Sequence, residues 1–178
     1  MGAAMRQWAI GIAALASAPA SAAVVQSGPN SFAIKHSVNL VIPPDQAYAA
    51  LGELPRWWNK DHTYSGDSAN LSLSLKAGGC FCERLEKGGG IEHMRVTLVQ
   101  PGERVVMTGA LGPLLFEGVS GVMDFKVERI AGGSKVTLDY RAAGFANGNA
   151  AELAPAVDKV LGEQLRHYRE YVVQRKPG

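Results

Sequence analysis

Residues 153–173, LAPAVDKVLGEQLRHYREYVV, decide the fold of this chain. Apolar side chains recur here at steps of three and four residues, which is the spacing of one face of an α-helix. The pattern predicts one long amphipathic helix that begins around Pro155, because proline is favoured in the first helical turn. Its apolar face consists of Leu153, Val157, Val160, Leu161, Leu165, Tyr168 and Val172.

The preceding part of the chain predicts a sheet for this helix to cover. Residues 32–42 alternate apolar and polar side chains and are expected to form a half-buried strand that stops at Pro43-Pro44. A short helix over 45–51 and a further helical turn that carries Trp57 and Trp58 follow it. Alternating segments separated by glycine and proline turns then predict hairpins. The further strands are expected over residues 71–75, 80–85, 93–98, 104–111, 119–130 and 136–141.

One face of these strands is apolar and the other is polar, as in an antiparallel sheet that is covered on one side. The C-terminal helix is the only predicted element large enough to cover that side. No internal repeat or long linker divides the chain. The pattern therefore predicts a single α+β domain over residues 32–175, preceded by a short polar lead over 23–31.

The first 22 residues have the layout of a secretory signal peptide. They contain one basic residue, Arg6, then an apolar run over 8–18, then the small residues SAPASA at 17–22. The apolar run is about half of the ~20 residues that a membrane span requires, so we expect cleavage after Ala22 and no retained span. The protein is therefore expected to be exported, either to a periplasm or out of the cell.

The charge balance excludes several classes of partner. The chain has 178 residues with 18 basic and 16 acidic side chains, and removal of Arg6 leaves 17 against 16. Such a balance provides no basic surface for nucleic acid and no charge-driven attachment to membranes. No nucleophile elbow, phosphate loop or pair of metal ligands is present in the sequence, so no cofactor and no metal are expected. The absence of a catalytic motif favours binding over catalysis.

The order of elements resembles that of the START-like (SRPBCC) superfamily. The local sequence is most similar to relatives of the activator of heat-shock protein 90 ATPase, and polyketide cyclase/dehydrase-like proteins are a further group. The matching pieces are PPDQAY at 43–48, LPRWW at 54–58 and KAGGCFCE at 76–83. The resemblance covers about residues 32–173. It implies a helix-grip fold, in which a curved antiparallel sheet of about six or seven strands wraps around the C-terminal helix and encloses a cavity.

In many members of the superfamily this cavity holds a hydrophobic ligand. We therefore expect this protein to bind a small hydrophobic molecule, such as a lipid or a sterol-like or polyketide-like compound. Of the two adjacent tryptophans, one is expected in the core and one at the rim of the cavity. The residues expected to contact the ligand are Trp57, Trp58, Met94, Met107, Phe116, Met123, Tyr140, Leu161, Leu165 and Tyr168.

Two other functions are compatible with the sequence. A cyclase- or dehydratase-type enzyme would use His93, Glu83 or Glu117 together with a tyrosine hydroxyl, since a carboxyl group in an apolar cavity has a raised pKa and can act as an acid. The alternation places His93 on the solvent side of its strand. A filled-core interaction module would instead dock an unknown protein partner through the apolar connection 112–118, GPLLFEG, which could otherwise serve as a lid.

Cys80 and Cys82 lie two residues apart on a predicted strand, so their side chains leave the same face. Three interpretations remain open: small apolar packing, a disulfide, or half of a metal site. Cα atoms two apart on a strand are about 6.5 Å from each other, which is near the upper limit for a disulfide. The four histidines have no ligand-like spacing to the cysteines; they are His36, His62, His93 and His167.

Overall fold

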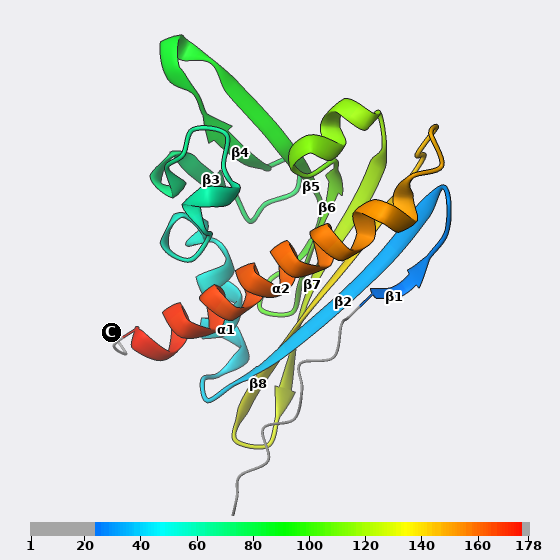
Figure 1. Ribbon diagram of the computed structural model, residues 1–178. Coiled ribbons are helices and arrows are strands. Elements are labelled where there is room, and N and C mark those ends of the chain that lie inside the picture. The colour runs from blue at the N-terminus through cyan, green and yellow to red at the C-terminus, as the bar shows by residue number, and fades with distance from the viewer. Residues whose placement is uncertain (1–23, 176–178) are drawn as a thin grey trace, which may run out of the picture.

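The computed structural model describes residues 24–175, and the expected signal peptide lies outside this range. An eight-stranded antiparallel sheet curves around one long helix (Figure 1). The strands are β1 (Val24–Ser27), β2 (Ser31–Leu40), β3 (Leu71–Leu73), β4 (Cys80–Arg84), β5 (Gly90–Gln100), β6 (Arg104–Gly109), β7 (Ser120–Ile130) and β8 (Gly133–Ala143). The α-helices are α1 (Pro44–Leu51) and α2 (Ala150–Gln174). Short 3-10 turns are η1 (Leu54–Arg56), η2 (Lys60–His62), η3 (Ser68–Asn70), η4 (Glu86–Gly88) and η5 (Gly112–Glu117).

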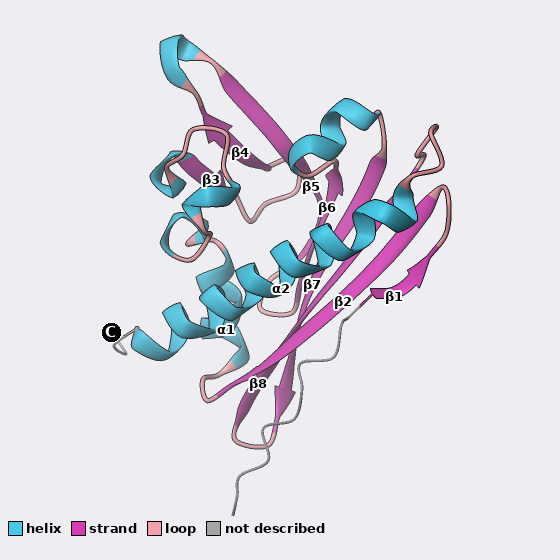
Figure 2. Cartoon of the chain, viewed as in Figure 1, coloured by secondary structure: helices cyan, strands magenta, loops and turns pink. Residues whose placement is uncertain are grey.

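The order of strands in the sheet is β1-β2-β8-β7-β6-β5-β4-β3. From β3 to β8, strands that are adjacent in the sheet are also consecutive in the sequence. The first long strand, β2, pairs with β8, so the start and the end of the chain's strands lie side by side. Figure 2 shows α2 lying across the sheet, with α1 beside its C-terminal half. This is the predicted helix-grip arrangement. None of the helices within residues 24–175 combines the length and the apolarity needed to cross a bilayer.

The sheet has one strand more than the six or seven expected. The additional strand is β1, which pairs with β2 through Ser27 and Phe32. Its four residues are mostly exposed and show no apolar face, so the sequence carries no periodic signal for it.

The long helix begins at Ala150 rather than around Pro155. The first turn is held from outside the helix, because the Ala150 N–H donates to the carbonyl of Pro29. The Asn149 carbonyl accepts from Glu152 and Leu153 and so starts the helical hydrogen bonds before the proline is reached. Pro155 lies in the second turn. A proline at such a position has no N–H to donate to the carbonyl four residues earlier, and its ring crowds that carbonyl.

The apolar face of α2 is buried unevenly. Leu161, Leu165, Tyr168 and Val172 are buried in the core. The apolar residues nearer the N-terminus of the helix, Leu153, Val157 and Val160, are only half-buried. The C-terminal half of α2 therefore closes the core, and its N-terminal half leaves space beneath it.

Strand β5 contains two β-bulges, and these change which side chains face the core. One bulge leaves His93 without a partner on β4, because Phe81 pairs with Met94 and Cys82 pairs with Glu92. His93 and Met94 are consequently both buried, so the expectation of a solvent-facing His93 is wrong. The second bulge, near Val96, turns Leu98 outward, where it is 40% exposed. An extra residue in one strand reverses the alternation beyond it.

Candidate functional site: an apolar pocket with a buried His–Glu pair

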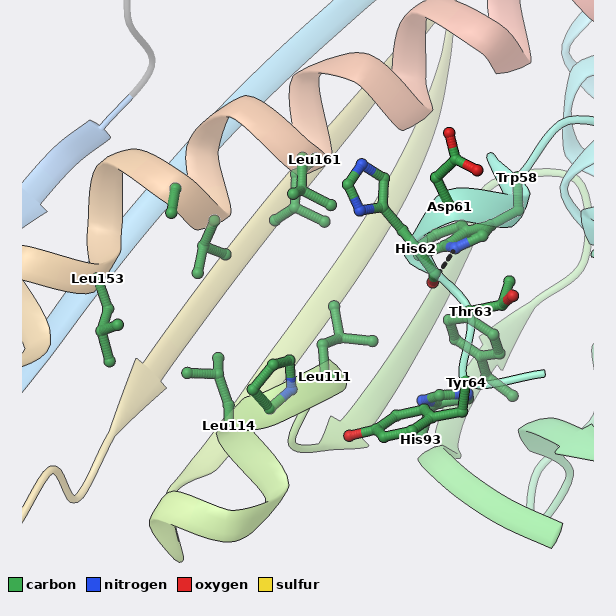
Figure 3. Close-up of a pocket in the computed structure, with 16 residues that line it drawn as sticks. Trp58, Asp61, His62, Thr63, Tyr64, His93, Leu111, Leu114, Leu153 and Leu161 are labelled. Atoms are coloured by element: carbon green, nitrogen blue, oxygen red, sulfur yellow. Dashed lines mark hydrogen bonds between the residues drawn. The ribbon is translucent and has the colours of Figure 1, made fainter. Parts of the chain in front are cut away.

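A pocket of about 430 Å³ lies under the N-terminal half of α2 (Figure 3). Its other walls come from η5, from the segment 61–64 and from strands β4 and β5. The lining residues are Trp58, Asp61, His62, Thr63, Tyr64, Phe81, His93, Leu111, Gly112, Pro113, Leu114, Leu153, Ala156, Val157, Val160 and Leu161.

Polar and apolar groups occupy different sides of this pocket. All five side chains that α2 contributes are apolar, and η5 and Leu111 extend this surface. The polar lining residues belong to the segment 61–64 and to β5, which contributes His93. In Figure 3, Tyr64 and His93 lie together at one end of the pocket, and Leu153 and Leu161 descend from the helix on the other side. The pocket therefore suits a molecule that is largely apolar and has one polar end.

The segment 59–65, which forms the polar wall, is attached at both of its ends. At one end, the Asn59 N–H donates to Oε1 of the buried Gln164 on α2 at 2.8 Å. At the other end, the N–H groups of Tyr64 and Ser65 donate to the Glu83 carboxylate at 3.2 and 2.6 Å. The wall is thus tied both to the helix and to strand β4.

Glu83 and His93 form a buried pair behind this wall. Glu83 is 2% exposed and His93 is 6% exposed, and Oε2 of Glu83 lies 2.9 Å from Nε2 of His93. The imidazole also packs between two rings, with centroid distances of 4.8 Å to Phe81 and 5.9 Å to Tyr64. Three neighbours therefore fix the orientation of the imidazole.

The surroundings set the charge state of the pair. Burial lowers the pKa of His93 below its ordinary value of 6.5, and the Glu83 carboxylate offsets only part of that effect. Burial alone would raise the pKa of Glu83, but hydrogen bonds from Ser65, Tyr64 and His93 outweigh it and bring the pKa below 4.5. At neutral pH the pair consists of an ionised carboxylate and a neutral imidazole.

This charge state determines the tautomer of His93. The ionised carboxylate can only accept hydrogen bonds, so Nε2 of His93 must carry the proton and donate it. Nδ1 then holds a lone pair. Nδ1 has no hydrogen-bond partner among residues 24–175, and it is not among the polar atoms that are sealed from solvent. His93, which lines the polar end of the pocket, therefore carries one acceptor that has no partner among the described residues.

Some residues expected to contact a ligand line this pocket and others do not. Trp58, Leu161 and His93 line it. Glu83 lies directly behind His93, whereas Glu117 is half-buried and outside the lining. Phe116 is 79% exposed and points away from the core. The remaining expected contacts are packed in the core and do not line the pocket; they are Trp57, Met94, Met107, Met123, Tyr140, Leu165 and Tyr168.

Both tryptophans are buried, and of the two Trp58 lines the pocket whereas Trp57 lies in the core away from it. Each indole N–H finds a backbone carbonyl, Trp57 that of Ala50 at 3.1 Å and Trp58 that of His62 at 3.0 Å. The two rings are covered by different elements. Trp57 packs edge-on against Tyr168 of α2, and Trp58 packs edge-on against Phe81 of β4.

Sequence reasoning missed most of the polar wall. Asp61, Thr63 and Tyr64 lie in a segment without periodicity, and nothing in the sequence indicates that Glu83 holds it. The sequence does indicate the apolar wall, because its periodicity places Leu153, Val157 and Val160 on the apolar face of the helix.

Cys80 and Cys82 are joined by a disulfide on the side of β4 opposite to Phe81 and Glu83. Their Cα atoms are 5.4 Å apart, closer than in a regular extended strand, and the strand pairing is irregular between Phe81 and Cys82. Of the interpretations left open by the sequence, the structure contains the disulfide. No group of three or more His, Cys, Asp or Glu side chains within residues 24–175 is placed to hold a metal ion.

The curved sheet and the long helix across it, with the pocket between them, form a helix-grip fold. Solved structures with this arrangement include protein MLL2253 from Mesorhizobium loti, with a TM-score of 0.60, 12% identity, and coverage of 82% of this chain and 99% of that one. The Aha1 dimer from Colwellia psychrerythraea has a TM-score of 0.55 and 19% identity, over 82% of this chain and 98% of that one.

A third similar structure is the di-domain ARO/CYC StfQ from the steffimycin biosynthetic pathway, with a TM-score of 0.52 and 14% identity. The match covers 83% of this chain and 52% of StfQ, about half of that protein. At these identities the likeness concerns the fold alone. No protein-family model and no curated protein sequence matches the chain.

The Glu83 carboxylate is expected to stabilise the polar wall strongly. In Glu83→Gln the amide nitrogen is a donor that faces groups which themselves donate, so the free energy of unfolding should fall by about 2 kcal/mol. Chemical denaturation measures this loss. The matched control is Glu117→Gln, outside the pocket, which should change stability by less than ~0.5 kcal/mol. Equal effects of the two substitutions would contradict the role given to Glu83.

Acid is expected to destabilise the protein through His93. A histidine whose pKa is lower in the folded state binds more protons when unfolded, so its stabilising contribution is complete above pH 6.5 and is lost as the pH falls through that value. The lowered pKa of Glu83 has the same effect at lower pH, because its stabilising contribution is lost as the pH falls below 4.5. His93→Gln should abolish the loss of stability that begins near pH 6.5 and should keep the loss that Glu83 causes at lower pH. Denaturant unfolding at a series of pH values tests this, and parallel curves for the two proteins between about pH 7 and about pH 5 would show the inference to be wrong.

Proposed function

We propose that this protein is an exported binding protein for a small hydrophobic molecule, which it holds between its sheet and its C-terminal helix. The single observation that carries the proposal is the pocket of about 430 Å³ whose helix side is wholly apolar. Small-molecule sites typically have volumes of ~300–1,000 Å³ and a mostly apolar lining with a few polar groups. A cavity of this size argues against the filled-core interaction module.

The lining supports a flat or elongated apolar ligand such as a lipid or a sterol-like or polyketide-like compound. The rings of Trp58 and Phe81 meet edge-on beside the pocket, with centroids 5.1 Å apart, and offer aromatic surface to the ligand. Burial of apolar ligand surface would supply the affinity at about 25 cal/mol per Å². The polar wall would fix the orientation.

A cyclase-type enzyme is the second candidate, and the His93–Glu83 pair favours it. A neutral imidazole that a buried carboxylate holds in place is an arrangement suited to general base chemistry. The di-domain ARO/CYC StfQ shares the fold. The tyrosine available to such a reaction would be Tyr64, since Tyr140 and Tyr168 do not line the pocket. Binding alone returns the ligand unchanged, whereas an enzyme converts it.

Export is supported by two independent features of the chain. The layout of residues 1–22 is that of a signal peptide. The Cys80–Cys82 disulfide fits an oxidising compartment, because disulfides persist outside the reducing cytosol. A role in activating a cytosolic chaperone is therefore not part of the proposal.

Ligand binding is tested by filling the pocket from the helix. Ala156→Trp adds a large ring at an exposed position that lines the pocket, so the fold should tolerate it while the cavity shrinks. Binding of the fluorescent apolar probe N-phenyl-1-naphthylamine should weaken at least about tenfold, which corresponds to ~1.4 kcal/mol.

The matched control for this substitution is Lys159→Trp, because Lys159 is exposed on the same helix and does not line the pocket. It should bind the probe as the unaltered protein does. The proposal fails if the unaltered protein does not bind the probe, or if both variants bind it equally well.

Export is tested by following the N-terminus. The protein recovered from outside the cytosol should begin at Ala23, as measured by intact mass. Leu15→Arg places a charge in the apolar run and should leave the full-length chain in the cytosol. Recovery of an uncleaved chain from the cytosol in both cases would refute the export proposal.

A further inference from the structure

We propose that the ligand carries a hydroxyl group, as in an alcohol or a phenol, and that this hydroxyl donates a hydrogen bond to Nδ1 of His93. The inference rests on the proposed binding function and adds to it the chemical class of the ligand. It follows from the acceptor that the buried His93–Glu83 pair leaves unpaired beside the pocket.

The Glu83 carboxylate is not available to accept a hydrogen bond from the ligand. It already accepts from Tyr64 and Ser65 and from Nε2 of His93, and it lies behind His93 rather than in the lining. His93 lines the pocket, and its Nε2 is committed to Glu83. Nδ1 is therefore the only nitrogen of this pair that a ligand can reach.

Nδ1 is also held in place before any ligand arrives. The hydrogen bond to Glu83 and the rings of Phe81 and Tyr64 prevent the imidazole from turning its other edge to the pocket. An acceptor that is fixed in advance loses little conformational freedom on binding. A ligand that covers Nδ1 without donating to it leaves a polar atom unpaired, which costs free energy.

The charges around the pocket select a neutral donor. No lysine or arginine of residues 24–175 is among the lining residues, so a carboxylate or phosphate group has no counter-ion there. A cationic group would lose its hydration in a pocket that is mostly apolar, which costs free energy. The buried Glu83 carboxylate does not offset this cost, because it already accepts hydrogen bonds from three donors. Asp61 is exposed, and its Oδ1 lies 3.4 Å from Nζ of Lys60, so its charge is already paired. A hydroxyl group satisfies Nδ1 without bringing a charge into the pocket.

The experiment compares two probes that differ by one group, 2-naphthol and 2-methylnaphthalene, by titration calorimetry near neutral pH. The unaltered protein should bind 2-naphthol about tenfold more tightly, as expected for one net hydrogen bond of ~1–1.5 kcal/mol. His93→Phe keeps a ring between Phe81 and Tyr64 but removes the acceptor, and it should bind both probes equally. His167→Phe, which alters a half-buried histidine of α2 outside the lining, should retain the preference.

A second readout needs no variant and stands if His93→Phe does not fold. The ¹⁵N resonance of Nδ1 should shift when 2-naphthol binds and should stay in place when 2-methylnaphthalene binds. Equal affinity of the unaltered protein for the two probes overturns the inference. So does a preference for 2-naphthol that persists in His93→Phe, or an Nδ1 resonance that does not shift when 2-naphthol binds. Failure of both probes to bind would instead overturn the binding function on which the inference rests.

Discussion

The polar side of the pocket depends on one buried carboxylate. Glu83 accepts hydrogen bonds from two backbone N–H groups of the segment 59–65 and from the imidazole of His93 on the neighbouring strand. A charge of this kind is costly to bury unless every hydrogen bond is made, so the three donors are constrained to meet at one place. The consequence is that a loop without regular structure becomes a fixed wall, and that a histidine becomes a defined acceptor rather than a titrating surface group.

The single apolar face of α2 packs into the core along its C-terminal half and lines the pocket along its N-terminal half. Its C-terminal half is packed into the core against α1, where Tyr168 donates a hydrogen bond to the carbonyl of Ala47 at 2.6 Å. Its N-terminal half lies over the pocket and leaves Val157 and Val160 half-buried. The periodicity of the sequence is the same in both halves. The helix and the sheet it covers could therefore be predicted from the sequence, whereas the division between core and cavity could not, because it depends on what lies beneath each turn.

The candidate site was less predictable than the fold for a specific reason. Alternation along β5 assigns His93 to solvent, and a β-bulge, which leaves no mark in this sequence, turns the side chain inward. Large apolar side chains such as the methionines and tyrosines expected around a ligand fill cores as readily as they line cavities, and here they lie in the core. Tyr64 and Glu83 come from different segments, and the contact that joins them across 19 positions is a property of the folded chain.

The two ends of the sheet are formed by its two shortest strands. β1 has four residues and β3 has three, whereas the central strands β7 and β8 have eleven each. An outermost strand exposes unpaired N–H and C=O groups that can recruit a strand from another molecule. The short outer strand β1 pairs with β2 only over residues 32–34, so residues 35–40 of β2 have a paired strand, β8, on one side alone. The same topology that forms the pocket thus leaves the outer edge of β2 as the long stretch of backbone on which a strand from another molecule can extend the sheet.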